Sequence, residues 1–217
     1  MRAFVFPGQG AQTIGMGQDL AASYPAAKAV FEEVDDALGQ DLSGLIWNGD
    51  IETLTLTANA QPALMATSLA ALRALESEGL GLDTASFVAG HSLGEYSALV
   101  AAGVLTLAQA APLVRFRAAA MQDAVAVGAG AMAAVLGMEA AKVIEGCAQV
   151  QATFPANSGE VVEAVNFNDP SQTVIAGSKA AVEKACEVLK AMGAKRALNL
   201  PVSAPFHSSL MKPAAEK

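Results

Sequence analysis

Short apolar runs alternate with longer amphipathic stretches over the first 127 residues. The runs at residues 2–10 and 85–90 are typical of short strands, the first ending in a glycine turn. Longer stretches with apolar residues at helical spacing predict helices, which we place at residues 24–39, 59–79, 93–102 and 106–123. Because strands alternate with helices, we expect an α/β fold with a parallel sheet covered by helices on both faces.

The pattern changes near residue 128. We predict, in order, a strand at 131–137, a helix at 138–150, strands at 160–167 and 172–178, a helix at 179–194 and a strand at 195–203. The order β-α-β-β-α-β is that of the ferredoxin-like split βαβ unit. We therefore predict an inserted ferredoxin-like domain over residues 128–198. The larger domain would comprise residues 1–127 and 199–217.

Composition narrows the class of protein. Hydrophobic residues make up 53% of the chain and charged residues 16%, which indicates a compact globular protein. The formal net charge of −8 argues against broad binding of nucleic acid. The most apolar stretch, residues 97–114, is interrupted by Gly103, Gln109 and Pro112, so we predict no membrane span. The N-terminus lacks the apolar core of a signal peptide, and we expect a cytoplasmic protein.

The two cysteines, Cys147 and Cys186, both fall in predicted helices. Their number and spacing indicate neither a disulfide framework nor a metal site. We interpret them as two buried thiols.

A serine flanked by glycines stands between a predicted strand and a predicted helix. Residues 90–94, GHSLG, fit G-x-S-x-G. In a nucleophile elbow of this pattern the serine occupies a strained turn, and its neighbours must be small so that the backbones can approach. The N-terminus of the following helix would favour a developing oxyanion. We interpret Ser92 as a nucleophile. The alternative is a polar residue in an ordinary strand-to-helix connection.

A serine nucleophile needs a base, and the chain has two histidines. His91 adjoins Ser92, and neighbouring side chains on such a turn diverge, so packing or hydrogen bonding beneath the turn is its expected role. His207 lies in the proline-bracketed segment PVSAPFHSSLMKP. Elimination makes His207 the candidate general base.

The segment FPGQGAQTIGMG places glycines directly after the first predicted strand. The dinucleotide-binding pattern G-x-G-x-x-G fails, because Gly8 and Gly10 are followed by Thr13 where the third glycine should stand. The alternative is a tight loop whose backbone N–H groups face the elbow and supply a second oxyanion donor.

One arginine lies on an apolar helix face. Positions 110, 114, 117 and 121 share that face, and Arg117 is its one charged member, whereas Arg115 is expected to point to solvent. A guanidinium in apolar surroundings needs a partner. A buried Asp or Glu of the protein and a substrate carboxylate, held by a bidentate fork, fit equally well.

Several motifs in one order carry a family resemblance. They are FPGQGAQ, QPAL, GHSLGEYSAL, the arginine of VRFRAAAMQ, GAMAAVLG, VNFNDPSQTVIAG and PVSAPFHSSLMKPA. Together they closely resemble the malonyl-CoA:acyl carrier protein transacylases of fatty acid synthesis, and the acyltransferase domains of polyketide synthases are similar. The resemblance covers essentially the whole chain. It implies an α/β-hydrolase-like subdomain with a ferredoxin-like insert.

The resemblance also implies roles for particular residues. Ser92 matches the family's nucleophile, His207 its base and Arg117 the arginine that binds the malonyl carboxylate. The implied set also includes the oxyanion-hole N–H groups of Gln9 and Leu93, the substrate-binding Gln61, and Phe206, which would leave little room for a 2-methyl branch.

The implied reaction transfers a malonyl group from coenzyme A to the phosphopantetheine thiol of an acyl carrier protein, with no metal or redox cofactor. Because such carriers are acidic, we expect docking on a local basic patch formed by Lys190, Lys195 and Arg196, which the family architecture would place near the cleft. A serine thioesterase or esterase and a non-catalytic carrier-protein-binding module are the alternative functions.

The chain departs from the family in length. Members of the family continue well beyond the histidine segment, so we expect further elements of the large subdomain to be missing from these 217 residues. The group that orients His207 is therefore not identified. We also expect apolar faces of the first two strands to meet water, and a chain of this length to be a poor catalyst.

Overall fold

The computed structural model describes residues 1–202 and 204–217, and its contacts divide the chain into two compact units. The first unit comprises Met1–Ala119 and the second Ala120–Lys217. Helix α7 (Leu107–Asp123) runs across the point of division.

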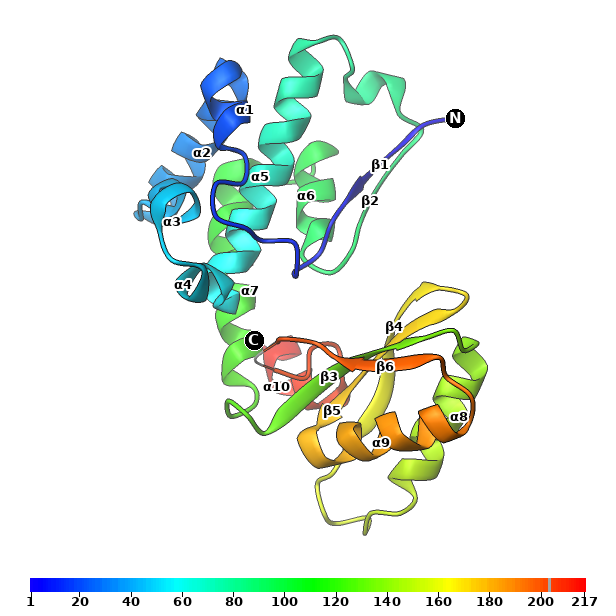
Figure 1. The fold of residues 1–217 in the computed structure, drawn as a ribbon. Helices are drawn as coiled ribbons and strands as arrows, with labels where there is room; N and C mark the ends of the chain where they lie inside the picture. Colours follow the sequence, from blue (N-terminus) through cyan, green and yellow to red (C-terminus); the bar gives the residue numbers. More distant parts are fainter. Residues whose placement is uncertain (203) are drawn as a thin grey trace. The chain divides into compact units, whose positions relative to one another are not determined.

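The first unit is mainly helical. Its helices are α1 (Gln18–Ser23), α2 (Pro25–Leu38), α3 (Leu42–Asn48), α4 (Ile51–Thr55), α5 (Thr57–Ser77), the 3₁₀ turn η1 (Leu82–Thr84) and α6 (Gly94–Ala101). Figure 1 shows α5 running through the middle of this unit, between α2 and α6. Almost every residue of Thr57–Ala66 is buried, and apolar side chains of α2, α3, α5 and α6 form one core around this helix.

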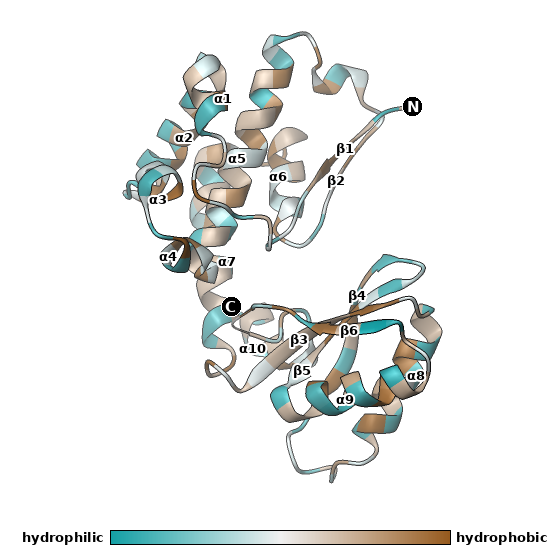
Figure 2. Ribbon diagram, viewed as in Figure 1, coloured by the Kyte–Doolittle hydropathy of each residue, from teal (hydrophilic) through white to brown (hydrophobic). Residues whose placement is uncertain are grey.

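Two parallel strands, β1 (Ala3–Phe6) and β2 (Phe87–Gly90), lie beside these helices with Phe6 opposite Gly90. Helix α6 packs against both strands, but burial on both faces is not observed: Val5 is 71% exposed and Phe87 60% exposed. The expectation that helices cover both faces is therefore wrong for these strands, whereas the expectation that their apolar faces meet water in a chain of this length agrees with the exposure of Val5 and Phe87. The apolar colouring of β1 is visible in Figure 2.

The second unit contains an antiparallel sheet with the predicted ferredoxin-like order. Its elements are β3 (Gly130–Leu136), α8 (Ala140–Gln151), β4 (Val162–Asp169), β5 (Gln172–Ser178), α9 (Lys179–Ala191), β6 (Arg196–Asn199), the 3₁₀ turn η2 (Ser209–Met211) and α10 (Lys212–Ala215). Over the described residues the strand order is β4-β5-β3-β6. Figure 1 shows α8 and α9 on one side of this sheet.

Both faces of the central strands of this sheet, β3 and β5, are covered. Because successive strand side chains point to opposite faces, Ala133 and Val135 pack against α8 and α9, whereas Met132 faces the other way. On that second face Met132 belongs to a cluster with Phe206 and Met211 from the C-terminal segment. Successive side chains of β3 thus enter two different apolar layers, one on each face of the sheet.

The α/β class is confirmed, with differences in detail. The short helices α1, α3 and α4 were not predicted, and α5 begins at Thr57, two residues before the predicted start. The last predicted strand reached residue 203, which lies outside the described residues; β6 ends at Asn199. The assignment of 1–127 with 199–217 to one domain and 128–198 to another stays a prediction.

Candidate active site

Ser92 occupies a sharp turn between β2 and α6. The strand ends at Gly90, and the His91 N–H donates to the Phe6 carbonyl at 3.0 Å, which extends the parallel pairing by one residue. Ser92 then has φ 54°, and the chain enters α6 at Gly94. A positive φ at a non-glycine residue costs of the order of 1–3 kcal/mol and is found where surrounding structure enforces it. The predicted elbow is therefore present in the backbone.

The glycines of the elbow are required by close backbone approach. A Cβ on Gly90 would overlap the Gly94 carbonyl group, and a Cβ on Gly94 would overlap the carbonyl of Phe6. A Cβ on Gly8 would meet the His91 imidazole, so this ring lies against Gly8, where its predicted packing role places it. Side chains at these glycines would push the elbow away from the end of β1.

The PGQG loop and the elbow follow neighbouring strand ends. Because β1 and β2 are parallel, the loop after Phe6 and the turn after Gly90 leave the pair at the same edge. The side chain of Gln9 donates to the Thr57 hydroxyl at 3.4 Å. Leu93 is the N-cap residue of α6, so its N–H lies outside the intrahelical bonds of that helix. The N–H groups of Gln9 and Leu93 stay predicted oxyanion donors.

Arg117 makes direct contact with Ser92. Its Nη2 donates to Ser92 Oγ at 3.0 Å, and its Nη1 donates to Gln61 Oε1 at 2.6 Å. The guanidinium carbon lies 5.8 Å from the centre of the Tyr96 ring, within cation–π range. Gln61 is 2% exposed on α5, which fixes its side chain. The structure thus brings together three predicted residues, Ser92, Arg117 and Gln61.

The surroundings of Arg117 bear on the two partners considered for it, a buried Asp or Glu of the protein and a substrate carboxylate. The helix face is apolar as predicted, since Ala110, Val114 and Met121 are all buried. Among the described residues Arg117 forms no ion pair with a carboxylate. Burial lowers the pKa of its guanidinium, and the more distant Tyr96 and Glu95 oppose that shift. Arginine stays protonated in proteins, so a partly desolvated cation lies beside the Ser92 hydroxyl.

Arg115 does not behave as predicted. It is half-buried, and its Nε and Nη2 atoms are buried without a hydrogen-bond partner among the described residues. Burial accordingly lowers the pKa of this guanidinium as well. The prediction that Arg115 points to solvent is wrong, because helical periodicity gives the direction of a side chain and not what packs beside it.

His207 and Phe206 belong to the second unit. Phe206 is buried in the cluster with Met132 and Met211, whereas the His207 side chain is exposed. His207 has φ 66° and, with Ser92, is one of the two non-glycine residues of positive φ within residues 1–202 and 204–217. The roles of His207 as base and of Phe206 in selectivity stay predictions.

Alternative chemistries find little support in the described part of the chain. Both cysteines are buried and unpaired, and burial raises the pKa of Cys147 to about 12, so this thiol is not ionised near neutral pH. No group of His, Cys, Asp and Glu side chains that could hold a metal ion occurs among the described residues. No described helix is long and apolar enough to cross a membrane.

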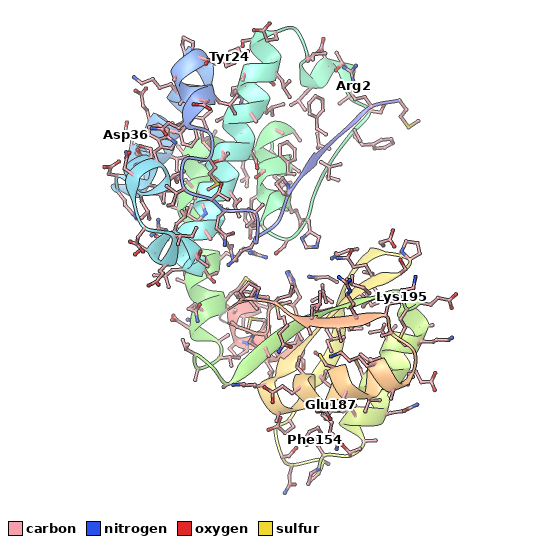
Figure 3. All side chains as sticks on the ribbon, in the orientation of Figure 1. Arg2, Tyr24, Asp36, Phe154, Glu187 and Lys195 are labelled. Carbon is pink, nitrogen blue, oxygen red and sulfur yellow. The ribbon has the colours of Figure 1, made fainter. Side chains whose placement is uncertain are left out.

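The predicted docking residues are all at the surface of the second unit. Lys190 is exposed near the end of α9, and Lys195 and Arg196 are exposed at the beginning of β6. Figure 3 labels Lys195. The aliphatic stem of Lys195 packs over Gly137, and the residue is exposed.

Two residues of the site were missed by sequence reasoning. Tyr96 lies in the first turn of α6, and its ring faces the Arg117 guanidinium. Thr57 lies one turn before Gln61 on α5 and holds the Gln9 side chain. Spacing of four residues on a helix would have indicated Thr57, because residues at i and i+4 share a face. The rule does not extend to Tyr96, because Ser92 precedes α6 and has a positive φ.

Comparison with known proteins agrees with this geometry. Residues 3–217 match the acyl transferase domain family. The chain is 54% identical over 215 residues to a malonyl CoA-acyl carrier protein transacylase of Bacillus subtilis, covering 99% of this chain and 65% of that relative. It thus spans about two thirds of the length of this relative.

Solved structures of similar proteins also match nearly the whole chain. An acyl-carrier-protein S-malonyltransferase from Burkholderia pseudomallei is 54% identical with a TM-score of 0.91, over 99% of this chain and 67% of that one. A malonyl transacylase in complex with its type II polyketide synthase acyl carrier protein is 48% identical with a TM-score of 0.91, over 99% and 67%. The serine elbow, the arginine beside it and the match along nearly the whole chain lead to one conclusion: the chain belongs to the acyl transferase domain family.

Proposed function

We propose that this chain provides the catalytic machinery for moving a malonyl group from malonyl-CoA to the phosphopantetheine thiol of an acyl carrier protein. The transfer proceeds through a malonyl ester on Ser92. It serves fatty acid or polyketide synthesis in the cytoplasm and needs no metal or redox cofactor. The names of the relatives, together with 54% identity, support this reaction class.

The contact between Arg117 and Ser92 is the observation that carries the proposal. A desolvated guanidinium without a carboxylate partner in the described chain lies 3.0 Å from the hydroxyl that would carry the acyl group. An acyl group that ends in a carboxylate, such as malonyl, would satisfy that cation by a bidentate ion pair. Acetyl and longer monocarboxylic acyl groups would leave it unpaired in a dehydrated site.

The first half-reaction loads the serine. His207 accepts the Ser92 hydroxyl proton while Oγ attacks the thioester carbonyl carbon. The N–H groups of Gln9 and Leu93 stabilise the oxyanion. The carbon–sulfur bond then breaks, and the departing coenzyme A thiolate takes the proton from His207. Arg117 and Gln61 hold the malonyl carboxylate throughout.

The second half-reaction reverses these roles. The carrier protein's thiol gives its proton to His207 and attacks the ester carbonyl of malonyl-Ser92, and the serine oxygen leaves with that proton. The buried ring of Phe206, next to His207, would restrict branching at the second carbon of the acyl group. Lys190, Lys195 and Arg196 would contact acidic side chains of the carrier protein.

Mass spectrometry of the intact protein tests the proposal. After mixing with malonyl-CoA, the chain should gain one malonyl group on Ser92, and added acyl carrier protein should remove it. Ser92→Ala is the control and should remain unmodified while keeping its fold, as judged by circular dichroism.

The same measurement separates the alternative functions. Rapid release of free malonate without carrier protein would indicate a thioesterase, in which water attacks the acyl-enzyme. Absence of any adduct would indicate a binding module without catalytic activity. Either result would contradict malonyl transfer.

A further inference from the structure

The turn that carries His207 is fixed on both sides. Phe206 before it is buried in the apolar cluster beneath the sheet of the second unit. Ser208 after it donates from Oγ to the Pro205 carbonyl at 2.7 Å, which closes the turn across the histidine. Between them His207 has φ 66°, a conformation that costs free energy at a non-glycine residue. Such a backbone persists when neighbouring contacts enforce it.

A further contact reaches this turn from a distant strand. Glu163 on β4 accepts a hydrogen bond at its Oε2 from the Ser209 N–H, at 2.6 Å. Ser209 is the first residue of η2, and the N-cap residue Ser208 supplies no side-chain cap for that helical turn. The Glu163 carboxylate therefore satisfies a helix N-terminal N–H that would otherwise lack a partner.

Glu163 and the histidine turn share one hollow of the second unit. A cavity of about 800 Å³ lies between α8 and β4 and is lined by Glu163, His207, Ser208 and Ser209, together with apolar residues of both elements. Glu163 is half-buried there. Its bond to Ser209 is exposed to solvent, and because the acceptor is a carboxylate the bond is charge-assisted, which makes it stronger than a neutral one.

We propose that Glu163 is a positioning residue for His207. Its carboxylate holds the chain two residues after the histidine and so keeps the turn in the left-handed conformation that directs the imidazole. The inference rests on the proposed function, in which His207 moves the proton in both half-reactions. Glu163 itself touches neither substrate nor the reacting atoms in this scheme.

Nuclear magnetic resonance of the two histidines tests the positioning directly. Because the chain contains only His91 and His207, labelled histidine gives two side-chain signals, and His207→Ala assigns them. Glu163→Ala should shift or broaden the His207 signal and leave that of His91 unchanged. Glu163→Gln keeps an acceptor oxygen and should restore the wild-type signal. Glu187→Ala, which removes an exposed carboxylate of α9 labelled in Figure 3, is the matched control.

Removing the donor gives an independent test. Ser209→Pro deletes the N–H at the first helical position, where proline is tolerated, and the preceding Ser208 is already extended with ψ 169°. It should change the His207 signal as Glu163→Ala does, and the double variant should add nothing further. An unchanged His207 signal in both single variants would overturn the proposal.

Loading rates from malonyl-CoA distinguish this proposal from the proposed function. Glu163→Ala should lower kcat by about 10-fold to 100-fold with little change in KM, since misplacing a reacting group by about 1 Å has effects of this size. If His207→Ala abolishes loading but Glu163→Ala does not slow it, the positioning role is wrong. If His207→Ala is loaded at the normal rate, His207 is not the base and the proposed function fails. The effect of Glu163→Ala on the His207 signal then still decides whether Glu163 positions the histidine turn.

Discussion

The two units of this chain differ in both charge and coverage of their strands. Residues 1–119 contain twelve Asp and Glu against five Lys and Arg, whereas residues 120–217 contain nine against eight. In the first unit β1 and β2 leave Val5 and Phe87 exposed, and an apolar hollow of about 370 Å³ lies beside β1. In the second unit the central strands are buried on both faces. The first unit is thus strongly acidic with partly uncovered strands, whereas the second is nearly neutral and its central strands are covered on both faces.

The two predicted catalytic residues therefore lie in different surroundings, one in each unit. The first unit holds Ser92, with the cation of Arg117 beside its hydroxyl, on an elbow that depends on glycine contacts with β1. The second unit holds His207 on a turn between Phe206, which is buried in an apolar cluster, and Ser209, which donates to Glu163. Within the described residues, each unit contains one non-glycine residue of positive φ, and these are the two residues expected to handle the proton. Strain of this kind at a predicted catalytic position supports a functional origin.

The largest effect should come from removing one reacting group from each unit. Ser92→Ala and His207→Ala should each lower malonyl loading by about 10⁴-fold or more, because nucleophile and base act together. For the same reason the double variant should be no worse than either single one. Stopped-flow loading of malonyl-CoA measures these rates. Effects that multiply in the double variant would show that the two residues act in separate steps.

A smaller and more selective effect is expected at Arg117. Arg117→Ala should raise the barrier for malonyl-CoA by about 2–5 kcal/mol, since a desolvated charge pair with the substrate is lost. Acetyl-CoA has no carboxylate and should be affected much less. The ratio of kcat/KM for the two thioesters is the measurement. Arg115→Ala is the control, because Arg115 is a half-buried arginine of the same helix whose Nε and Nη2 form no hydrogen bond among the described residues. Equal losses for both substrates would make Arg117 a structural residue.

The features that could be predicted from the sequence are those that depend on residues close together along the chain. The ferredoxin-like order follows from alternation and periodicity in strands and helices that pack on each other, and the elbow follows from glycines flanking Ser92. The contact between Arg117 and Gln61 joins α7 to α5 across 56 residues, and no local pattern specifies such a pairing. The burial of Arg115 and the bond between Glu163 and Ser209 depend on tertiary packing in the same way.

Hydrogen exchange tests the contrast in rigidity. Amides of β1, β2 and α6 should be less protected than those of β3 and β5, because strands with an exposed face open more readily. Gly94→Ala should lower the free energy of unfolding of the first unit by about 1–3 kcal/mol, because the new methyl group would overlap the carbonyl of Phe6. Gly193→Ala, in the second unit, should affect that unit alone. Uniform protection across the chain would remove the distinction between the two units.

The smallest effect concerns the approach of the carrier protein. An acidic partner is repelled less by the nearly neutral second unit than by the first, so docking should involve the exposed Lys190, Lys195 and Arg196. Exposed pairs contribute about 0.2–1 kcal/mol each, so reversing one charge, as in Lys195→Glu, should slow transfer to carrier protein by roughly 2-fold to 5-fold.

The salt dependence and the half-reaction affected identify a docking role. Loading from malonyl-CoA should be unchanged by Lys195→Glu, because that step does not involve the carrier. The effect on transfer should fade in about 1 M salt, where the Debye length falls to about 3 Å. Lys142→Glu introduces the same charge change on α8 and should leave both half-reactions at the wild-type rate. If Lys195→Glu slows both half-reactions equally, or if Lys142→Glu slows transfer as much, the three residues form no specific docking surface, and net charge alone governs the encounter.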